Sequence, residues 1–152
     1  MTAASALPAQ VGETFSRRFS FDTSSIRAFA LSVDDRNPLH HDEAVARAAG
    51  YPGLIASGTQ LGGIVMAMTA THFSQPTAEG HERSGLGIAF EIRFRAVVLA
   101  DEEMSATWTV TAIERKDRLD GWIVALEGET TSARGALLSG KGTLLLRLGP
   151  PR

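Results

Sequence analysis

Apolar and polar residues alternate along the second half of the chain. Apolar side chains recur at every second position in four runs, residues 88–94, 104–111, 122–126 and 138–146. Such alternation is typical of strands that bury one face. The pairs Asp120-Gly121 and Arg134-Gly135 interrupt the pattern where turns are expected. The pattern therefore predicts four long antiparallel strands, and Thr14–Phe21 predicts a shorter one near the start.

A long helix is predicted between these strands. The segment Gly58–Phe73 is apolar around its whole circumference, which predicts a buried helix without a solvent-exposed face. Ser57 and Gln60 fit a capping box at its start. Gly62 and Gly63 are unfavourable in a helix interior, so we expect another backbone or a ligand to approach them. We therefore place both glycines at a predicted substrate pocket.

Two shorter helices are predicted before the long one. The first is capped by Thr23 or Ser24, and its apolar face holds Ile26, Phe29, Ala30 and Val33. The second follows Asp42, a favourable N-cap residue, and ends at Gly50. A buried helix together with curved antiparallel strands predicts an α+β domain, in which the sheet wraps around the long helix.

Composition narrows the class of protein. A chain of 152 residues with 43% hydrophobic and 21% charged residues fits one globular domain, which we expect over residues 13–148 after a flexible segment over residues 1–12. The net charge of −2 and the scattered basic residues argue against a nucleic-acid surface. Cysteine is absent, which excludes disulfides and thiolate chemistry. The N-terminal segment lacks the pattern of a signal peptide or a membrane span, so a cytoplasmic protein without membrane contact is expected.

The candidate chemistry lies in the segment Asp35-Arg36-Asn37-Pro38-Leu39-His40. Pro38 restricts its own backbone and that of Asn37, and an Asn side chain can bond its own turn, so the segment is predicted to be a rigid loop. Its carboxylate and imidazole would point at one spot. The predicted helix start at Ser57-Gly58-Thr59 offers backbone N–H groups without intrahelical acceptors. These are the parts of an acid/base site with an anion hole.

Three motifs resemble the MaoC-like, R-specific enoyl-CoA hydratase family. The family signature D-x-N-P-[LI]-H matches residues 35–40, A-x-x-x-G-[FY] covers the region of Gly50-Tyr51, and I-[AV]-[HS]-G matches residues 55–58. The close match covers roughly residues 26–63. The resemblance implies a single hot dog fold, a curved antiparallel sheet wrapped around a long central helix. It further implies an acyl-CoA or acyl-carrier-protein thioester substrate and no cofactor, in a homodimer whose sheets join edge to edge.

The resemblance also implies roles for individual residues. Asp35 would be the base that activates a water and His40 the proton donor, although these two roles can be exchanged. The Gly58 N–H would bind the thioester oxygen. Supporting roles would fall to Asn37, Ser57 and Thr59. Ser57 replaces a frequent His of the family, which bears on rate and on acyl-chain preference.

Other interpretations of the same residues stay open. Asp35 and His40 can simply satisfy N–H groups of their loop, and Gly58 can begin an ordinary helix. Hot dog thioesterases and dehydratases of fatty-acid synthesis resemble this chain in fold, but both families place an acidic residue on the central helix, and residues 59–73 contain none. A non-catalytic acyl-binding protein is a further alternative. It would not require Asp35 and His40 to face one cavity.

The remaining His residues and two Arg residues can be explained without a catalytic role. The pair His40-His41 is not predicted to bind a metal, because no additional His or Cys is spaced to complete a metal site. His41 is therefore expected to face solvent. His72 is predicted at a helix end and His81 in a loop. Arg93 and Arg95 either form a solvated strand face with Glu91 or contact phosphates of CoA.

Overall fold

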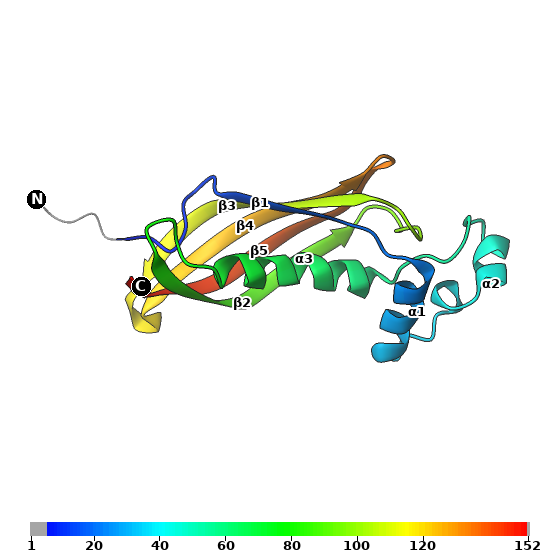
Figure 1. Ribbon diagram of the computed structural model, residues 1–152, viewed down its shortest axis with the longest axis horizontal. Coiled ribbons are helices and arrows are strands. Elements are labelled where there is room, and N and C mark those ends of the chain that lie inside the picture. Colours follow the sequence, from blue (N-terminus) through cyan, green and yellow to red (C-terminus); the bar gives the residue numbers. More distant parts are fainter. Residues whose placement is uncertain (1–5, 152) are drawn as a thin grey trace, which may run out of the picture.

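The computed structural model describes residues 6–151. Its central element is a five-stranded antiparallel sheet with the strand order β1-β3-β4-β5-β2 (Figure 1). The strands are β1 (Thr14–Phe19), β2 (His81–Phe94), β3 (Met104–Lys116), β4 (Gly121–Ser132) and β5 (Gly135–Pro151). The helices are α1 (Thr23–Ser32), α2 (Glu43–Ala48) and α3 (Gly58–Phe73). The predicted strands and the bounds of the long helix are confirmed, except that β1 ends at Phe19 rather than at Phe21.

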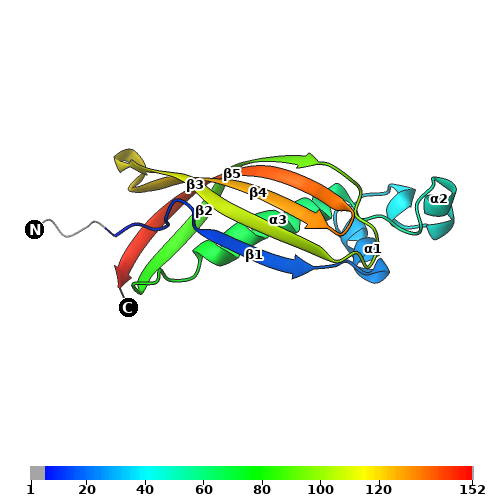
Figure 2. The ribbon, with the colours of Figure 1, turned by 90° about the horizontal axis from the view of Figure 1, so that it is seen from above.

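The sheet curls over α3, while α1 and α2 lie together at one end of the molecule (Figures 1 and 2). The predicted hot dog fold is confirmed by this arrangement. Short 3-10 turns follow α1 (Pro38–His40) and join β3 to β4 (Asp117–Leu119). His81 is the first residue of β2 rather than a loop residue, whereas His72 lies in the last turn of α3 as expected.

Aromatic rings fill the space between the sheet and α3. The indole of Trp108 is 1% exposed, and its Nε1–H donates to the Val65 carbonyl at 2.8 Å. A Cβ at Gly128 would lie 2.5 Å from the Trp108 ring, and one at Gly142 would lie 2.9 Å from Phe90. Real Cβ atoms do not approach so closely, so these two glycines make room for the rings that carry the helix.

The prediction that α3 has no exposed face is wrong. The face that packs on the sheet is buried, as at Leu61 (1% exposed) and Val65 (2%). On the opposite side Met66, Ala67 and Ala70 are exposed. The reason is geometric, because one curved sheet can cover only one side of a helix. The exposed face of α3 is therefore apolar.

The helix N-termini differ from their predictions in detail. Asp22, rather than Thr23 or Ser24, caps α1, because its Oδ1 accepts from the Ser25 N–H at 2.7 Å. Asp42 caps α2 as predicted, by accepting from the N–H groups of the second and third helical residues. An Asp just outside the first turn provides a carboxylate acceptor for N–H groups that have no intrahelical partner.

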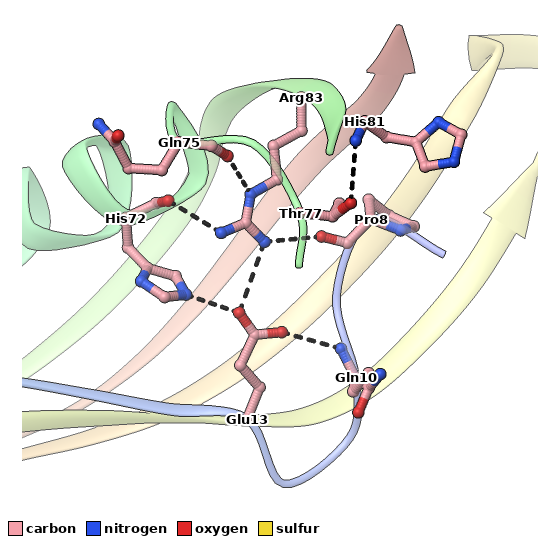
Figure 3. A network of polar contacts seen from close by, with 8 residues as sticks. All are labelled: Pro8, Gln10, Glu13, His72, Gln75, Thr77, His81 and Arg83. Carbon is pink, nitrogen blue, oxygen red and sulfur yellow. Dashed lines mark hydrogen bonds and ion pairs between the residues drawn. The ribbon is translucent and has the colours of Figure 1, made fainter. Parts of the chain in front are cut away.

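The chain before β1 is tied to the far end of α3 by a polar network (Figure 3). Arg83 Nη1–H donates to the Pro8 carbonyl at 2.9 Å, and Arg83 Nη2–H donates to the His72 carbonyl at 3.0 Å. Glu13 Oε1 accepts from His72 Nε2–H at 2.6 Å. Burial raises the pKa of Glu13, but the hydrogen bonds from His72 and the Gln10 N–H and the charge of Arg83 outweigh it, so this pKa is lowered.

This network binds Pro8 and Gln10 of the segment 1–12, which the sequence predicts to be flexible. Residues 1–5 lie outside the described residues. Ala9 is 3% exposed, and the Gly12 N–H donates to the Val110 carbonyl at 2.8 Å. Packing against the domain therefore begins before residue 13.

Within residues 6–151, no helix is both long and apolar enough to cross a membrane. In the same part of the chain, no three His, Asp or Glu side chains lie together as a metal site would require.

Candidate active site

The loop after α1 brings the Asp35 carboxylate to the His40 imidazole. Asp35 Oδ2 lies 3.4 Å from His40 Nε2. The loop is held locally, since the Asn37 N–H donates to Asp35 Oδ1 at 3.1 Å and Asn37 Oδ1 accepts from the Leu39 N–H at 3.1 Å. Asn37 therefore stabilises the turn, as its residue type suggests. The side chain of Asp35 is 29% exposed, whereas that of His40 is 7% exposed.

A backbone carbonyl fixes the orientation and tautomer of His40. Its Nδ1 lies 2.7 Å from the carbonyl oxygen of Ile55. A carbonyl oxygen only accepts, so Nδ1 carries a hydrogen. Nε2, which faces Asp35, is therefore the nitrogen that can exchange a proton with the carboxylate or with a water beside it.

The expectation that His41 faces solvent is wrong. Its ring is partly buried, and Nε2–H donates to the backbone carbonyl of Asp35 at 2.6 Å. The Arg27 Nε–H donates to the carbonyl of His41 at 3.1 Å. His41 thus holds the backbone that carries Asp35. The adjacent His residues are a signal for this, but the sequence alone does not show the 3-10 turn over Pro38–His40 that directs His41 back to Asp35.

The start of α3 lies beside His40. The Ile55 N–H donates to the Leu39 carbonyl at 3.2 Å, and the Ala56 N–H donates to the Val98 carbonyl at 2.9 Å. This pairing anchors the chain just before Gly58. As the first residue of α3, Gly58 has an N–H without an intrahelical acceptor, and no partner for it occurs among residues 6–151.

The predicted capping box at Ser57 is wrong. The Ser57 side chain makes no capping hydrogen bond, and the Gln60 N–H donates instead to the Ser57 backbone carbonyl at 3.1 Å. Ser57 Oγ lies 3.2 Å from Thr59 Oγ1, and Ser57 is 3% exposed. The Gln60 side chain turns toward α1, where its Nε2–H donates to the Ser25 backbone carbonyl at 3.4 Å. Packing against α1 has replaced the local cap.

One cavity of about 460 Å³ joins these elements. It is lined by Asn37, His40, Ile55–Gly58, Leu61 and Phe94–Val98. The ring of Phe94 lies directly on Gly58, because a Cβ at Gly58 would be 2.9 Å from Phe94 Cζ. Asp35 does not belong to this lining, although its Oδ2 lies 3.4 Å from His40 Nε2. An imidazole and a free helix N–H thus face one apolar-walled hollow.

Of the remaining predicted residues, Gly62 and Gly63 do not line this cavity. Gly62 is buried, and a Cβ there would lie 4.0 Å from Phe94 Cζ. A Cβ on Gly63 would meet nothing within 4 Å. Thr59 is exposed at the helix start. The backbone of Gly63 is therefore open on the uncovered face of α3.

A carboxylate that the motifs did not indicate holds the wall of the cavity. Glu102 accepts from the Leu99 N–H at 2.9 Å and from Arg134 Nε–H at 2.7 Å, and Arg134 Nη2–H also donates to the Val97 carbonyl at 2.7 Å. Burial raises the pKa of Glu102, but the hydrogen bonds from Arg134, Ser132 and the Leu99 N–H and the charge of Arg134 outweigh burial and lower this pKa to about 2. The ion pair connects the loop that lines the cavity to the β4–β5 turn.

The sequence matches the profile of the family described as "FAS1-like, dehydratase domain region" over residues 9–139. The chain belongs to this family. Its predicted place among the MaoC-like hot dog proteins is confirmed, since a similar solved structure is described as a MaoC-like dehydratase.

Two curated relatives, both named "UPF0336 protein", match only short stretches of the chain. The one from Saccharopolyspora erythraea is 56% identical over 34 residues, 22% of each chain. The one from Mycolicibacterium paratuberculosis is 46% identical over 43 residues, 28% of this chain and 25% of its own. This family member thus aligns with about a quarter of those relatives.

Solved structures resemble this FAS1-like dehydratase-region protein over nearly its whole length. A MaoC-like dehydratase from Rhodospirillum rubrum is 27% identical, with 93% of this chain and 95% of that chain covered and a TM-score of 0.75. The (R)-hydratase from A. caviae involved in PHA biosynthesis is 22% identical, with 96% and 100% covered and a TM-score of 0.75. The (3R)-hydroxyacyl-ACP dehydratase complex HadBC from Mycobacterium tuberculosis is 20% identical, with 91% and 99% covered and a TM-score of 0.72. At these identities the last two comparisons establish the fold.

Proposed function

We propose that the protein catalyses the (R)-specific hydration of trans-2-enoyl thioesters, or the reverse dehydration of (3R)-hydroxyacyl thioesters. The observation that carries this proposal is the approach of Asp35 Oδ2 to His40 Nε2, at 3.4 Å, beside the cavity into which the start of α3 opens. Membership of a dehydratase-region family supports it. The reaction needs no cofactor, because water, two proton-transfer groups and an oxyanion donor suffice.

The proposed reaction adds water across the double bond of the substrate. A water held between Asp35 and His40 gives a proton to the carboxylate while its oxygen bonds to the β-carbon. The double-bond electrons move toward the thioester oxygen, which the Gly58 N–H and the positive end of α3 stabilise. Nε2–H of His40, in its doubly protonated form, then gives its proton to the α-carbon.

The contact between Asp35 and His40 also resets the site. After one turnover the carboxyl carries a proton and the imidazole has lost one. A proton transfer between Oδ2 and Nε2, directly or through water, restores the starting state. The two roles can also be exchanged, because a carboxyl and an imidazole can each give or accept a proton. Both groups act from one side of the bound double bond, which accounts for a single stereochemical product.

The direct test is the hydration of crotonyl-CoA and of longer and branched enoyl-CoA thioesters, followed by loss of the enoyl absorbance. Release of free thiol is measured in parallel. Hydration without thiol release supports the proposal, whereas thiol release would favour a thioesterase. Hydration of no enoyl thioester, combined with tight binding, would favour a non-catalytic acyl-binding protein.

Substitution of the pair tests its role. Loss of one general acid or base typically costs about 10²–10⁴-fold in rate, so we expect Asp35→Asn and His40→Ala each to lose at least about 10²-fold in kcat. The double variant should lose much less than the product of the two, because both groups act on one water. Melting temperatures serve as the folding control. Folded variants with near-normal rates would contradict the proposed mechanism.

We further propose that the protein forms a homodimer through β2 and the open face of α3. β2 is a 14-residue edge strand, paired only with β5. It exposes Leu86 (61%), Ile88 (54%) and Phe94 (53%). Long apolar edge strands are unusual unless another chain covers them. Phe94 also lines the candidate cavity, so a partner at this edge would cover part of its wall.

A further inference from the structure

Arg95 connects the candidate active site with a second hollow on the outer face of the sheet. It lines the cavity that contains His40, and it also lines a hollow of about 300 Å³ formed by β2, β4 and β5. Along β2 the side chains of Phe90 and Ile92 pack toward the core. Arg95 therefore begins on the outer face at the point where the strand reaches the cavity.

Among the cations around this outer hollow, Arg95 has, in the described part of the chain, neither an ion pair nor a carboxylate opposite it in the strand register. Arg93 Nε–H donates to Glu91 Oε1 at 2.9 Å. Lys141 stands directly between Glu91 on β2 and Glu127 on β4 in the strand register. Lys141 forms no ion pair within residues 6–151, but it has a carboxylate opposite it on each neighbouring strand. Arg95 forms no ion pair with any residue between 6 and 151.

Within residues 6–151, the partner of the Arg95 side chain is a hydroxyl group. Its Nε–H and Nη2–H both donate to Ser139 Oγ, at 3.0 and 2.8 Å. A guanidinium has five N–H donors in a planar fork that suits bidentate binding of phosphate. Three of these donors remain open on an exposed side chain.

We propose that Arg95 binds the phosphate of the phosphopantetheine arm that carries the acyl thioester. This inference rests on the proposed function. An enoyl thioester whose carbonyl reaches Gly58 must leave the cavity by its sulfur side, and this arm ends in a phosphate both on CoA and on a carrier protein. The outer hollow receives the arm where it leaves the cavity, and Arg95 supplies the charge that the phosphate needs. It is a positioning residue for binding and takes no part in proton transfer.

The test compares substrates with and without the phosphate. Crotonyl-CoA, crotonyl-phosphopantetheine and a crotonyl carrier protein contain it, whereas crotonyl-pantetheine and crotonyl-N-acetylcysteamine do not. We expect Arg95→Ala to raise KM for the phosphate-bearing thioesters by about tenfold, as for a partly screened charge-assisted contact, with kcat nearly unchanged. KM for the two phosphate-free thioesters should not change. Arg95→Lys should retain part of the effect, because it keeps the charge and loses the fork.

Arg93→Ala is the matched control, because it removes a cation from the same strand face that Glu91 already neutralises. It should leave KM for every thioester within about twofold, in keeping with a weak exposed ion pair. Equal losses for Arg95→Ala on all thioesters would overturn the proposal, and so would no loss on any. Comparison of the CoA and carrier-protein substrates shows which source of the phosphate the site accepts.

Binding measurements separate this inference from the proposed function. Crotonyl-CoA and crotonyl-pantetheine are titrated into the catalytically impaired Asp35→Asn protein with and without Arg95→Ala. A loss of affinity confined to crotonyl-CoA supports the phosphate contact even if the parent hydrates no thioester. If the parent hydrates the phosphate-free thioesters but Arg95→Ala binds crotonyl-CoA normally, only the phosphate contact is refuted.

Discussion

Backbone carbonyl groups determine how the candidate site is oriented at the scale of single residues. The Ile55 carbonyl fixes the tautomer of His40, and the Asp35 carbonyl holds His41. Asp35→Asn keeps an oxygen that can accept from the Asn37 N–H, so it tests the chemistry of the carboxylate with little change to the loop. His40→Ala also removes the buried hydrogen bond to the Ile55 carbonyl, so its melting temperature must be compared with its rate.

Ser57 provides a second test at this scale. Replacement of a capping Ser by Ala typically costs about 1 kcal/mol. Because Ser57 makes no capping hydrogen bond, we expect Ser57→Ala to lower the free energy of unfolding by only about 0.5 kcal/mol, the low end for a neutral hydrogen bond, through the lost contact with the Thr59 hydroxyl. Urea denaturation measures this difference. Asp42→Ala, which removes an actual cap, is the positive control and should cost about 1 kcal/mol. Equal losses in the two variants would restore a capping role for Ser57.

At the scale of elements, the loop between β2 and β3 is the least regular wall of the cavity. Asp101 there adopts a positive φ of 60°, a conformation that favours glycine. Its N–H donates to the Phe21 carbonyl at 2.7 Å. The loop keeps this shape because Glu102 and Arg134 bind its backbone at Leu99 and Val97.

The Glu102–Arg134 pair predicts a pH dependence of stability. The folded pKa of Glu102, about 2, lies below its ordinary value of 4.5. A depressed folded pKa stabilises the protein above the ordinary value, and this contribution is lost as the pH falls from 4.5 toward 2. We expect Glu102→Gln to lose about 1–3 kcal/mol at pH 7, the usual contribution of a hydrogen bond to a charged group, and progressively less below pH 4.5. Urea unfolding at a series of pH values measures both. A constant difference between the two proteins across this range would contradict the assignment.

At the scale of the whole molecule, the open edge of β2 and the open face of α3 predict the assembly. The parent protein should sediment as a dimer at micromolar concentration. Ile88→Lys places a charge on the exposed apolar edge, so this variant should sediment as a monomer. Leu119→Lys alters an apolar side chain that is 42% exposed in the β3–β4 turn, away from β2, and should remain a dimer. A monomeric parent would refute the assembly, and a monomeric Leu119→Lys would refute its location.

By itself, the sequence determined the elements and the residue types of the site. Strand alternation and the apolar run of α3 depend on local periodicity, so the bounds Gly58–Phe73 followed from the pattern alone. The turn from Asp35 to His40 was equally local, because Pro38 and Asn37 act within a few residues. These features require no knowledge of distant contacts.

Only the tertiary structure decided which local possibilities were used. The Gln60 side chain turned to Ser25 instead of completing a capping box, and the Glu102 carboxylate found Arg134, which is 32 residues away in the chain. The Arg95 guanidinium bound Ser139 on β5 rather than Glu91, which lies four residues earlier in the chain. Such choices depend on which groups the curled sheet brings together, because a hydrogen bond reaches only about 3 Å and periodicity carries no information about distant partners.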